Sequence, residues 1–202
     1  MRMTARDGGF TLIELLAAIA ILGVITVPLA NVVLVYLRTS DQTVARLTES
    51  SDAQLAAAYF ARDVASIGVR APTSPYPLQS SIDTSGSAAW PYPCSTLGTI
   101  PLVRLVWDDY PGGAATATQV RVAYVVSTDG TQLRRLMCSG SDVPRSTVLL
   151  ARSLDPGTSA AVSCSPACSG TPDTVTVRLT FKAATSRTGP YPVTLTGQRR
   201  QT

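Results

Sequence analysis

Gly8-Gly9-Phe10-Thr11-Leu12-Ile13-Glu14-Leu15-Leu16 opens an apolar run that continues to Leu37, and this segment decides how the chain is organised. Glu14 is the only charged residue between Phe10 and Leu37. At a rise of about 1.5 Å per residue, a helix of this length crosses a bilayer core of about 30 Å. A carboxylate inside hydrocarbon costs about 2.5–3.5 kcal/mol on insertion scales, so we predict that Glu14 is functional and has a charged partner.

The residues around this run indicate which side of the membrane the rest of the chain occupies. The segment from Met1 to Gly9 contains Arg2, Arg6 and Asp7. Basic residues before a span keep the N-terminus in the cytoplasm, so the remainder is expected outside. A secretory signal peptide has a shorter apolar core, of about 7–15 residues, whereas this run stays apolar beyond Ala30. We therefore expect a single-pass protein of the cytoplasmic membrane, with its head outside.

The stretch Gly9-Phe10-Thr11-Leu12-Ile13-Glu14 resembles the class III signal of type IV pilins and of the pseudopilins of type II secretion. The resemblance implies that a membrane prepilin peptidase cuts between Gly9 and Phe10, and that Phe10 is then N-methylated. It also implies that Glu14 meets the N-terminal amine of a neighbouring subunit and sets the axial register of a filament. The new α-amine has a reference pKa of about 8, so it is cationic. The two charges offset their desolvation only as a pair.

The same resemblance implies a subunit that works by assembly. The large head, the late strands and the helix ending in Tyr59-Phe60-Ala61-Arg62-Asp63-Val64 resemble J-type pseudopilins or W-type minor pilins. Such a subunit is assembled into, or primes, a type IV pilus at the cell surface or a type II secretion pseudopilus in the periplasm. The implied partners are prepilin peptidase, other pilin or pseudopilin subunits, the inner-membrane assembly platform and membrane lipid.

Gly23 and Pro28 interrupt the predicted span. Pro28 removes one backbone hydrogen bond and its ring clashes with the carbonyl group of Val24, so we expect the helix to bend there. The family resemblance implies that a stretch between such a glycine and proline can melt when subunits pack into a filament. A simple transmembrane kink is the alternative.

Residues 38–71 are predicted to continue as an amphipathic helix that packs on the head. The stripe predicted to be buried has spacings of three and four, and consists of Val44, Leu47, Ser51, Leu55, Ala58, Tyr59, Arg62 and Ala65. Charged residues lie off this stripe, among them Arg46, Glu49, Asp52 and Asp63. Gly68 and Ala71-Pro72 are predicted to end the helix.

The remainder of the chain is predicted to form a β-rich head. Residues 72–99 are rich in Pro, Ser, Gly and Tyr, which indicates an irregular surface loop. Strand patterns follow at 102–107, 119–126, 132–137, 147–151, 174–181 and 192–196, and Asp129-Gly130 is a type I′ hairpin signal. The fold class is therefore α+β: a long N-terminal helix, half transmembrane and half amphipathic, packed on a mainly antiparallel sheet, as in pilins. The predicted segments are a leader (1–9), an assembly helix (10–37), an outer helix (38–71) and the head (72–202).

The four cysteines are Cys94, Cys138, Cys164 and Cys168. An even number behind an export-like segment favours two disulfides in an oxidising compartment. A bond between Cys164 and Cys168 would staple a short loop, and Cys138, at the end of a predicted strand, could then reach Cys94. All three connectivities remain open. A four-cysteine zinc site is disfavoured because it needs two C-x2–4-C knuckles and only Cys164/Cys168 approximates one, so we expect no metal.

The composition argues against an enzyme. Histidine is absent, which removes the commonest general base, the Ser–His and Cys–His pairs and the commonest metal ligand. No serine has a nucleophile-elbow setting. We therefore expect neither catalysis nor a cofactor.

Two kinds of charged cluster have weaker candidate roles. Asp108-Asp109 could contribute to a calcium site, but no EF-hand-like ligand run surrounds it and a solvated turn is favoured. Arg134-Arg135 and Arg199-Arg200 could contact DNA, but no recognisable nucleic-acid module accompanies them. The net charge of +4 fits an ordinary solvated surface. Nucleic acid is thus the less favoured partner.

Two other classes of protein remain as alternatives. The first is a signal-anchored extracytoplasmic binding domain that never enters a filament. The second is a secreted enzyme with an atypical signal, which the missing histidine and the long span disfavour. The N-terminus of the mature chain distinguishes both from a processed pilin.

Overall fold

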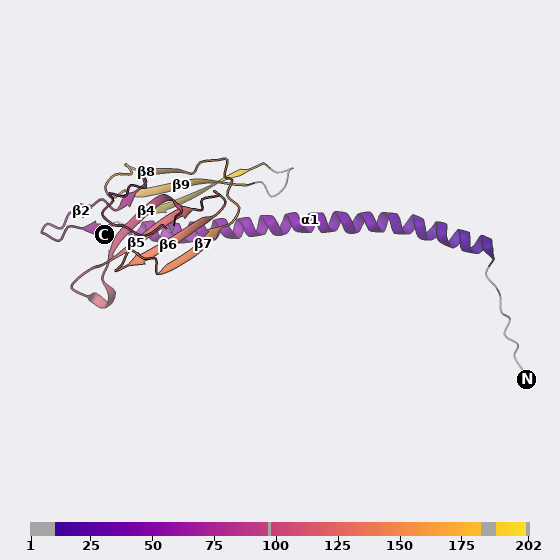
Figure 1. The fold of residues 1–202 in the computed structure, drawn as a ribbon, viewed down its shortest axis with the longest axis horizontal. Coiled ribbons are helices and arrows are strands. Elements are labelled where there is room, and N and C mark those ends of the chain that lie inside the picture. The colour runs from indigo at the N-terminus through magenta and orange to yellow at the C-terminus, as the bar shows by residue number, and fades with distance from the viewer. Residues whose placement is uncertain (1–10, 97, 183–188, 201–202) are drawn as a thin grey trace, which may run out of the picture. The chain divides into compact units, whose positions relative to one another are not determined.

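The computed structural model describes residues 11–96, 98–182 and 189–200 (Figure 1). Two compact units divide the chain, Met1–Val44 and Ala45–Thr202. Helix α1 (Leu12–Ser66) runs through the first unit and provides the first element of the second. All the strands that the structure describes belong to the second unit, which is called the head unit below.

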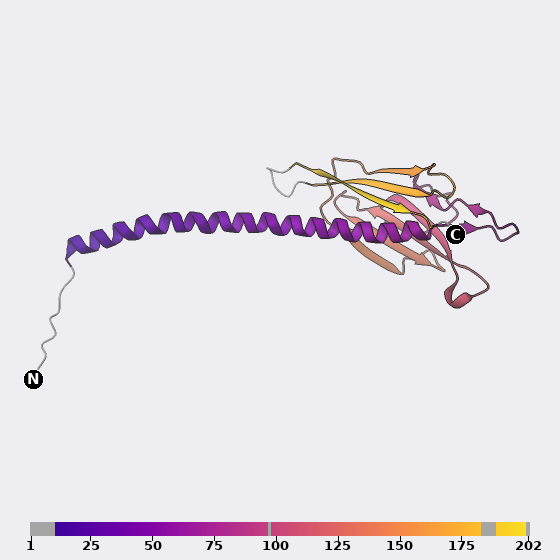
Figure 2. The same ribbon diagram turned by 180° about the vertical axis from the view of Figure 1, so that it is seen from behind.

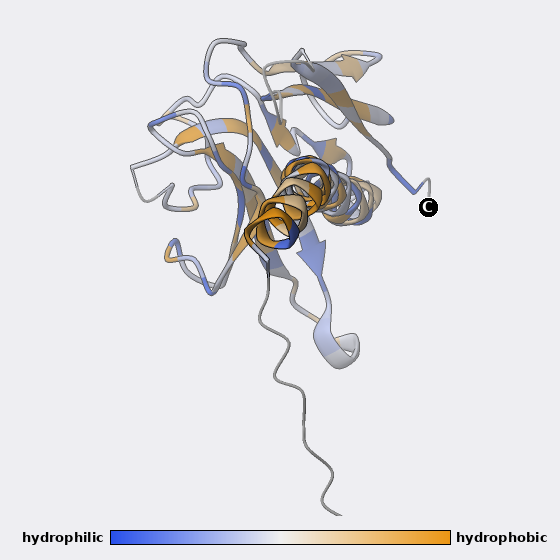
Figure 3. Cartoon of the chain, turned by 90° about the vertical axis from the view of Figure 1, so that its right-hand side faces the viewer, coloured by the Kyte–Doolittle hydropathy of each residue, from blue (hydrophilic) through white to orange (hydrophobic). Residues whose placement is uncertain are grey.

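The described part of the first unit is helical and apolar. Every residue from 11 to 39 is exposed. Figure 3, an end-on view, colours the N-terminal turns of α1 mostly orange, the colour of hydrophobic residues. By length and composition, α1 contains a segment that is able to cross a membrane. Because exposed apolar surface of this extent is unfavourable in water, the segment needs lipid or another apolar surface around it.

The strands of the head unit form three antiparallel sheets (Figures 1 and 2). Their bounds are β1 Val69–Arg70, β2 Leu78–Gln79, β3 Ile82–Asp83, β4 Ile100–Asp109, β5 Thr118–Val126, β6 Leu133–Ser139, β7 Ser146–Ala151, β8 Ala161–Ser165, β9 Thr174–Phe181 and β10 Tyr191–Gln198, with a 3-10 turn, η1, at Pro111–Gly113. The largest sheet has the order β3-β4-β5-β6-β7, the second has the order β10-β9-β8, and β1 pairs with β2. The predicted α+β class, with one long helix and antiparallel sheets, is confirmed.

One core joins the two large sheets to α1. Phe60 and Val64 of α1 are fully buried in it, and so are Tyr124 of β5 and Leu195 of β10. The rings of Phe60 and Tyr124 meet edge to face, with centroids 5.3 Å apart. Strand β9 alternates as its sequence predicts, and its buried residues are Val175, Val177, Leu179 and Phe181.

The face of α1 that meets the sheets differs from the predicted stripe. Leu47 and Leu55, which belong to that stripe, remain 65% and 40% exposed. The buried residues of this segment are Glu49, Asp52, Ala56, Phe60, Asp63 and Val64. The prediction was wrong because it left the carboxylates off the buried face, whereas all three bond to groups far away in the sequence.

The hairpin between β5 and β6 is present, but its turn is not type I′. A type I′ turn needs a positive φ at both central residues, and of Asp129 and Gly130 only the glycine has one, at 73°. Asp129 instead accepts hydrogen bonds from the Ser127 hydroxyl and the Thr131 backbone N–H, at 2.5 and 3.2 Å. The bonds from Ser127 and then Thr131 hold the pKa of the Asp129 carboxyl below its usual range. The connection between β5 and β6 therefore runs from Ser127 to Gln132 rather than through a two-residue turn, and side-chain hydrogen bonds stabilise it.

Strand β10 approaches α1 so closely that position 197 has no room for a side chain. A Cβ atom at Gly197 would lie 2.5 Å from the Cβ atom of Val64. Val64 is β-branched and has one favoured rotamer in a helix, so its side chain cannot turn away. We expect Gly197→Ala to lower the free energy of unfolding by about 3 kcal/mol, in the upper part of the overpacking range, as measured by chemical denaturation.

Gly189→Ala is the matched control for this substitution, because nothing lies within 4 Å of a Cβ atom placed at Gly189. It should unfold at nearly the same denaturant concentration as the parent chain. A loss below about 1 kcal/mol for Gly197→Ala would contradict the close approach of β10 to the helix.

Candidate functional site

Thr11 caps the N-terminus of α1. Its carbonyl oxygen accepts hydrogen bonds from the backbone N–H groups of Glu14 and Leu15, at 3.1 and 3.2 Å. Its hydroxyl oxygen lies 3.4 Å from the backbone nitrogen of Glu14 and accepts a further bond. Thr11 and Glu14 have the spacing of a capping box, a signal for the helix start that the sequence prediction had missed.

Glu14 lies exposed in the first turn of α1. A carboxylate there interacts favourably with the partial positive charge of the helix N-terminus. Among the residues that the structure describes, none forms an ion pair with Glu14. Gly9 and Phe10, where cleavage and methylation are predicted, lie outside the described residues. The pairing of Glu14 with an N-terminal amine therefore stays a prediction.

Helix α1 continues through Gly23 and Pro28 in this single chain. Pro28 has no backbone N–H, so the carbonyl group of Val24 loses its usual helical donor. Two residues earlier, the Thr26 hydroxyl donates to the Leu22 carbonyl oxygen at 2.6 Å. The predicted bend and the melting on assembly stay predictions.

Within the head unit, Asp63 connects the helix to two strands of the large sheet. The guanidinium group of Arg135 donates to both of its carboxylate oxygens, at 2.6 and 2.9 Å. The Tyr124 hydroxyl donates to the same carboxylate at 2.7 Å. Asp63 and Arg135 are only 1% and 3% exposed. The result is a buried, bidentate ion pair between α1 and β6, with a further bond to β5.

The environment of this pair favours its charged state. Burial alone would lower the pKa of the Arg135 guanidinium, but the bonds to Asp63 outweigh it and the pKa is raised. Burial and then the neighbouring Asp63 carboxylate raise the pKa of the Tyr124 hydroxyl. Tyr124 therefore stays a neutral donor, and Asp63 is the acceptor for both side chains.

Two further carboxylates of α1 face the sheets. Asp52 accepts a hydrogen bond from the backbone N–H of Arg152 at 3.1 Å. Glu49 accepts one from the Tyr191 hydroxyl at 3.1 Å. Burial and the bond to Glu49 raise the pKa of Tyr191 to about 12. Hydrogen bonds accepted by three carboxylates thus attach this part of the helix to the sheets and loops.

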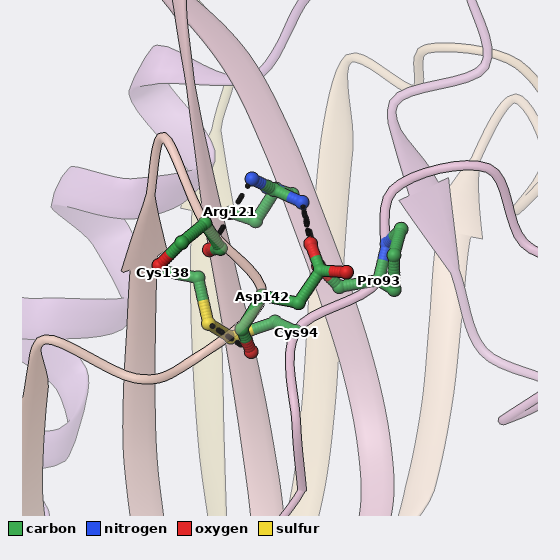
Figure 4. Close-up of a disulfide and its surroundings, with 6 residues drawn as sticks. Pro93, Cys94, Arg121, Cys138 and Asp142 are labelled. Atoms are coloured by element: carbon green, nitrogen blue, oxygen red, sulfur yellow. Dashed lines mark hydrogen bonds and ion pairs between the residues drawn. A yellow bond between two sulfur atoms is a disulfide. The ribbon is translucent and has the colours of Figure 1, made fainter.

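The cysteines pair as Cys94–Cys138 and Cys164–Cys168. The first disulfide is buried and lies beside Arg121 of β5 (Figure 4). Arg121 donates to the Pro93 carbonyl oxygen at 2.8 Å and to an Asp142 carboxylate oxygen at 2.6 Å. The disulfide and the arginine therefore tie the loop before residue 94 and the turn after β6 to the same strand. The second disulfide closes a loop at the end of β8, an edge strand.

Of the other charged candidates, Asp108 and Arg199-Arg200 line one small cavity. One Asp108 carboxylate oxygen accepts a hydrogen bond from the backbone N–H of Arg70 at 2.9 Å. Arg135 is in the core, so Arg134-Arg135 does not form an exposed basic pair. Arg199 forms an ion pair with Asp173 at 2.7 Å. In the described ranges, no group of three or more His, Cys, Asp or Glu residues is placed to hold a metal ion.

Comparison with known proteins bears on the N-terminal segment. Residues 4–30 match the family model of the prokaryotic N-terminal methylation motif. The match includes the predicted cleavage point and Glu14, Gly23 and Pro28. No curated protein and no solved structure matches the chain. The chain thus carries a prepilin-type methylation motif at its N-terminus, and this motif supports the type IV pilin and pseudopilin family.

Proposed function

We propose that this chain is a minor pilin or pseudopilin, of the J-type or W-type branch. The observation that carries the proposal is the methylation motif at residues 4–30, which lies at the start of an exposed apolar helix. Prepilin peptidase removes the leader (1–9) by cutting after Gly9, and Phe10 becomes the methylated N-terminus. The mature chain then consists of the assembly helix (10–37), the outer helix (38–71) and the head (72–202).

Cleavage creates the charge that assembly requires. Before processing, the peptide nitrogen of Phe10 is neutral, and Glu14 has no cationic partner among the described residues. After processing, Phe10 carries a cationic amine at the edge of the apolar helix. Both charges are costly in lipid, and the amine of one subunit with the Glu14 of its neighbour offsets that cost. Only processed subunits therefore assemble in register.

The head acts through contacts. Its disulfides and its buried Asp63–Arg135 pair make it a rigid body attached to the outer helix. The apolar side of the outer helix, including Leu47 and Leu55, is exposed in the single chain and is covered by neighbouring helices in the filament. The assembly platform of the cytoplasmic membrane and lipid are the partners before assembly.

The proposal is tested by isolating filaments from cells that carry the assembly machine. Sheared pili, or an affinity-purified pseudopilus, should contain the processed chain at a small fraction of the amount of a major subunit. Cells lacking prepilin peptidase should retain the full-length precursor in the membrane and yield filaments without it. A processed chain that remains entirely in the membrane fraction, without any other subunit, would instead support a signal-anchored binding domain.

A further inference from the structure

The head unit has a wide cleft that the proposed assembly role does not use. Its volume is about 1190 Å³. It lies between the segment that follows α1 and the connection from β4 to β5. The residues that matter to its chemistry are Arg70, Tyr76, Gln79, Asp108, Tyr110, Thr116, Thr118, Gln119 and Arg121. A concave site of this size, with both rings and polar groups, is a candidate binding site.

Two tyrosines in the lining of this cleft are exposed. Tyr76 is 53% and Tyr110 is 51% exposed. They come from different segments, Tyr76 from the loop between β1 and β2 and Tyr110 from the residue that directly follows β4. A tyrosine offers an apolar ring face and a polar hydroxyl with few rotatable bonds, which makes it suited to binding.

The backbone of Tyr76 has a conformation that a bulky residue rarely adopts. Tyr76 is the one residue other than glycine, among those described, with a positive φ, at 57°. A bulky residue is unfavourable in that conformation, and glycine would adopt it without cost. The backbone N–H of Tyr76 donates a hydrogen bond to the Thr73 carbonyl oxygen at 2.8 Å. The Tyr76 carbonyl oxygen accepts one from the Arg70 guanidinium group at 3.3 Å. Such strain is characteristic of residues kept for function.

The charges in the lining balance, which bears on the kind of ligand. The charged residues are Arg70, Asp108 and Arg121. Arg121 is neutralised by Asp142, at 2.6 Å. Arg70 and Asp108 then leave the lining without net charge. The lining itself therefore has no excess of positive charge to attract a phosphate or another strongly anionic ligand. The smaller adjoining cavity also has Arg199, which pairs with Asp173, and Arg200.

The part of the cleft wall around Arg121 is already ordered before a ligand binds. Arg121 donates to the carbonyl oxygens of Pro93 and Ser141, at 2.8 and 3.3 Å. The Cys94–Cys138 disulfide holds the same two segments together (Figure 4). A wall that is already ordered does not lose conformational entropy when a ligand binds.

We propose that this cleft binds a neutral oligosaccharide. A pyranose ring has an apolar face of C–H groups, which stacks on an aromatic ring, and a rim of hydroxyl groups, which pair with carboxylate, amide and guanidinium groups. The cleft offers both types of partner: exposed rings at Tyr76 and Tyr110, and polar side chains such as Asp108 and Gln119. Its volume of about 1190 Å³ has room for several consecutive sugar units.

The test uses the full-length chain in an amine-oxide detergent, because detergents with sugar headgroups would compete for the cleft. Isothermal titration calorimetry is carried out with cellohexaose, chitohexaose and mannohexaose. At least one should bind with a dissociation constant below about 1 mM. Decaproline and inorganic phosphate are titrated in parallel, as probes of a peptide groove and of an anion site.

Tyr76→Gly separates binding from folding. Glycine accepts the backbone conformation at this position, so the variant should unfold at the same temperature as the parent chain or higher. Saccharide binding should nevertheless weaken by about tenfold or more. Tyr110→Ala should weaken it as well. Val143→Ala is the matched control, since Val143 is 69% exposed and lies outside the cleft, and it should leave binding unchanged.

Three results would overturn the proposal. The first is that none of the three hexasaccharides binds measurably. The second is that Tyr76→Gly binds the saccharides as tightly as the parent chain while keeping its unfolding temperature. The third is that decaproline or phosphate binds more tightly than every saccharide, which would assign the cleft to a peptide or to an anion.

Discussion

Asp63→Ala is expected to lower the free energy of unfolding of the head unit by about 3–5 kcal/mol, the cost of breaking a buried ion pair by removing one partner. The substitution leaves the Arg135 guanidinium, 3% exposed, without its carboxylate. It also removes the acceptor of the Tyr124 hydroxyl. Because marginally stable proteins have only about 5–15 kcal/mol in total, this is the largest stability effect that we expect from a single substitution in the chain.

The measurement is chemical denaturation of the full-length protein, followed by the fluorescence of its tryptophans. Arg62→Ala is the matched control, because Arg62 lies 3.9 Å from the same carboxylate but its side chain is 65% exposed. It should cost less than about 1 kcal/mol, as exposed pairs do. Asp63→Asn keeps an acceptor for Tyr124, so its loss of unfolding free energy should fall between those of Asp63→Ala and Arg62→Ala. Equal, small losses for Asp63→Ala and Arg62→Ala would show that the buried pair does not hold the helix to the sheet.

Glu14→Ala is expected to leave processing intact and to reduce incorporation into filaments by about 100-fold or more. That factor corresponds to about 3 kcal/mol, the lower end of the cost of leaving one charge of a buried pair without its partner. Here the orphaned charge is the N-terminal amine of the neighbouring subunit. Quantitative immunoblots of membrane and filament fractions measure the ratio directly.

Two variants distinguish charge pairing from helix capping. Glu14→Gln keeps the size of the side chain but loses the charge, so it should fail to assemble as Glu14→Ala does. Thr11→Ala removes the capping hydroxyl, which costs about 1 kcal/mol of helix stability, and should reduce incorporation far less. Normal incorporation of the processed Glu14→Ala chain would refute the pairing.

Much of the fold follows from local patterns in the sequence. The predicted helical segments, 10–37 and 38–71, contain the whole of α1 (Leu12–Ser66) but extend five residues too far at the C-terminal end, and the six predicted strands correspond to β4, β5, β6, β7, β9 and β10. These elements have long runs with clear periods of 3.6 or 2 residues. β8, at Ala161–Ser165, was missed because its five residues are too few for a clear period. β2 and β3 have two residues each within the segment predicted to be a loop, and β1, at Val69–Arg70, lies where the outer helix was predicted to continue.

Which face of α1 is buried against the sheets could not be predicted in the same way. Its buried face is decided by partners that are distant along the chain, such as Arg135 for Asp63 and Tyr191 for Glu49. A single-sequence periodicity places carboxylates toward water unless those partners are known. The cleft could not be predicted either, since its lining brings together Tyr76 and Tyr110 from segments that are distant in the sequence.

The N-terminal site, in contrast, could be predicted from the sequence. Its signal, from Gly9 to Glu14, is contiguous, so the sequence alone indicates the cleavage point, and the match over residues 4–30 supports the same interpretation. What the sequence does not contain is the other half of the Glu14 pair, because that group belongs to a second subunit.

Mass spectrometry of the mature N-terminus tests the central claim most directly. The intact chain is purified from membranes of cells that contain prepilin peptidase, and its N-terminal peptide is sequenced by fragmentation. The account predicts a chain that begins at Phe10 and carries a methyl group on its α-amine. An N-terminus that retains Met1, or cleavage at any bond other than Gly9–Phe10, would contradict it.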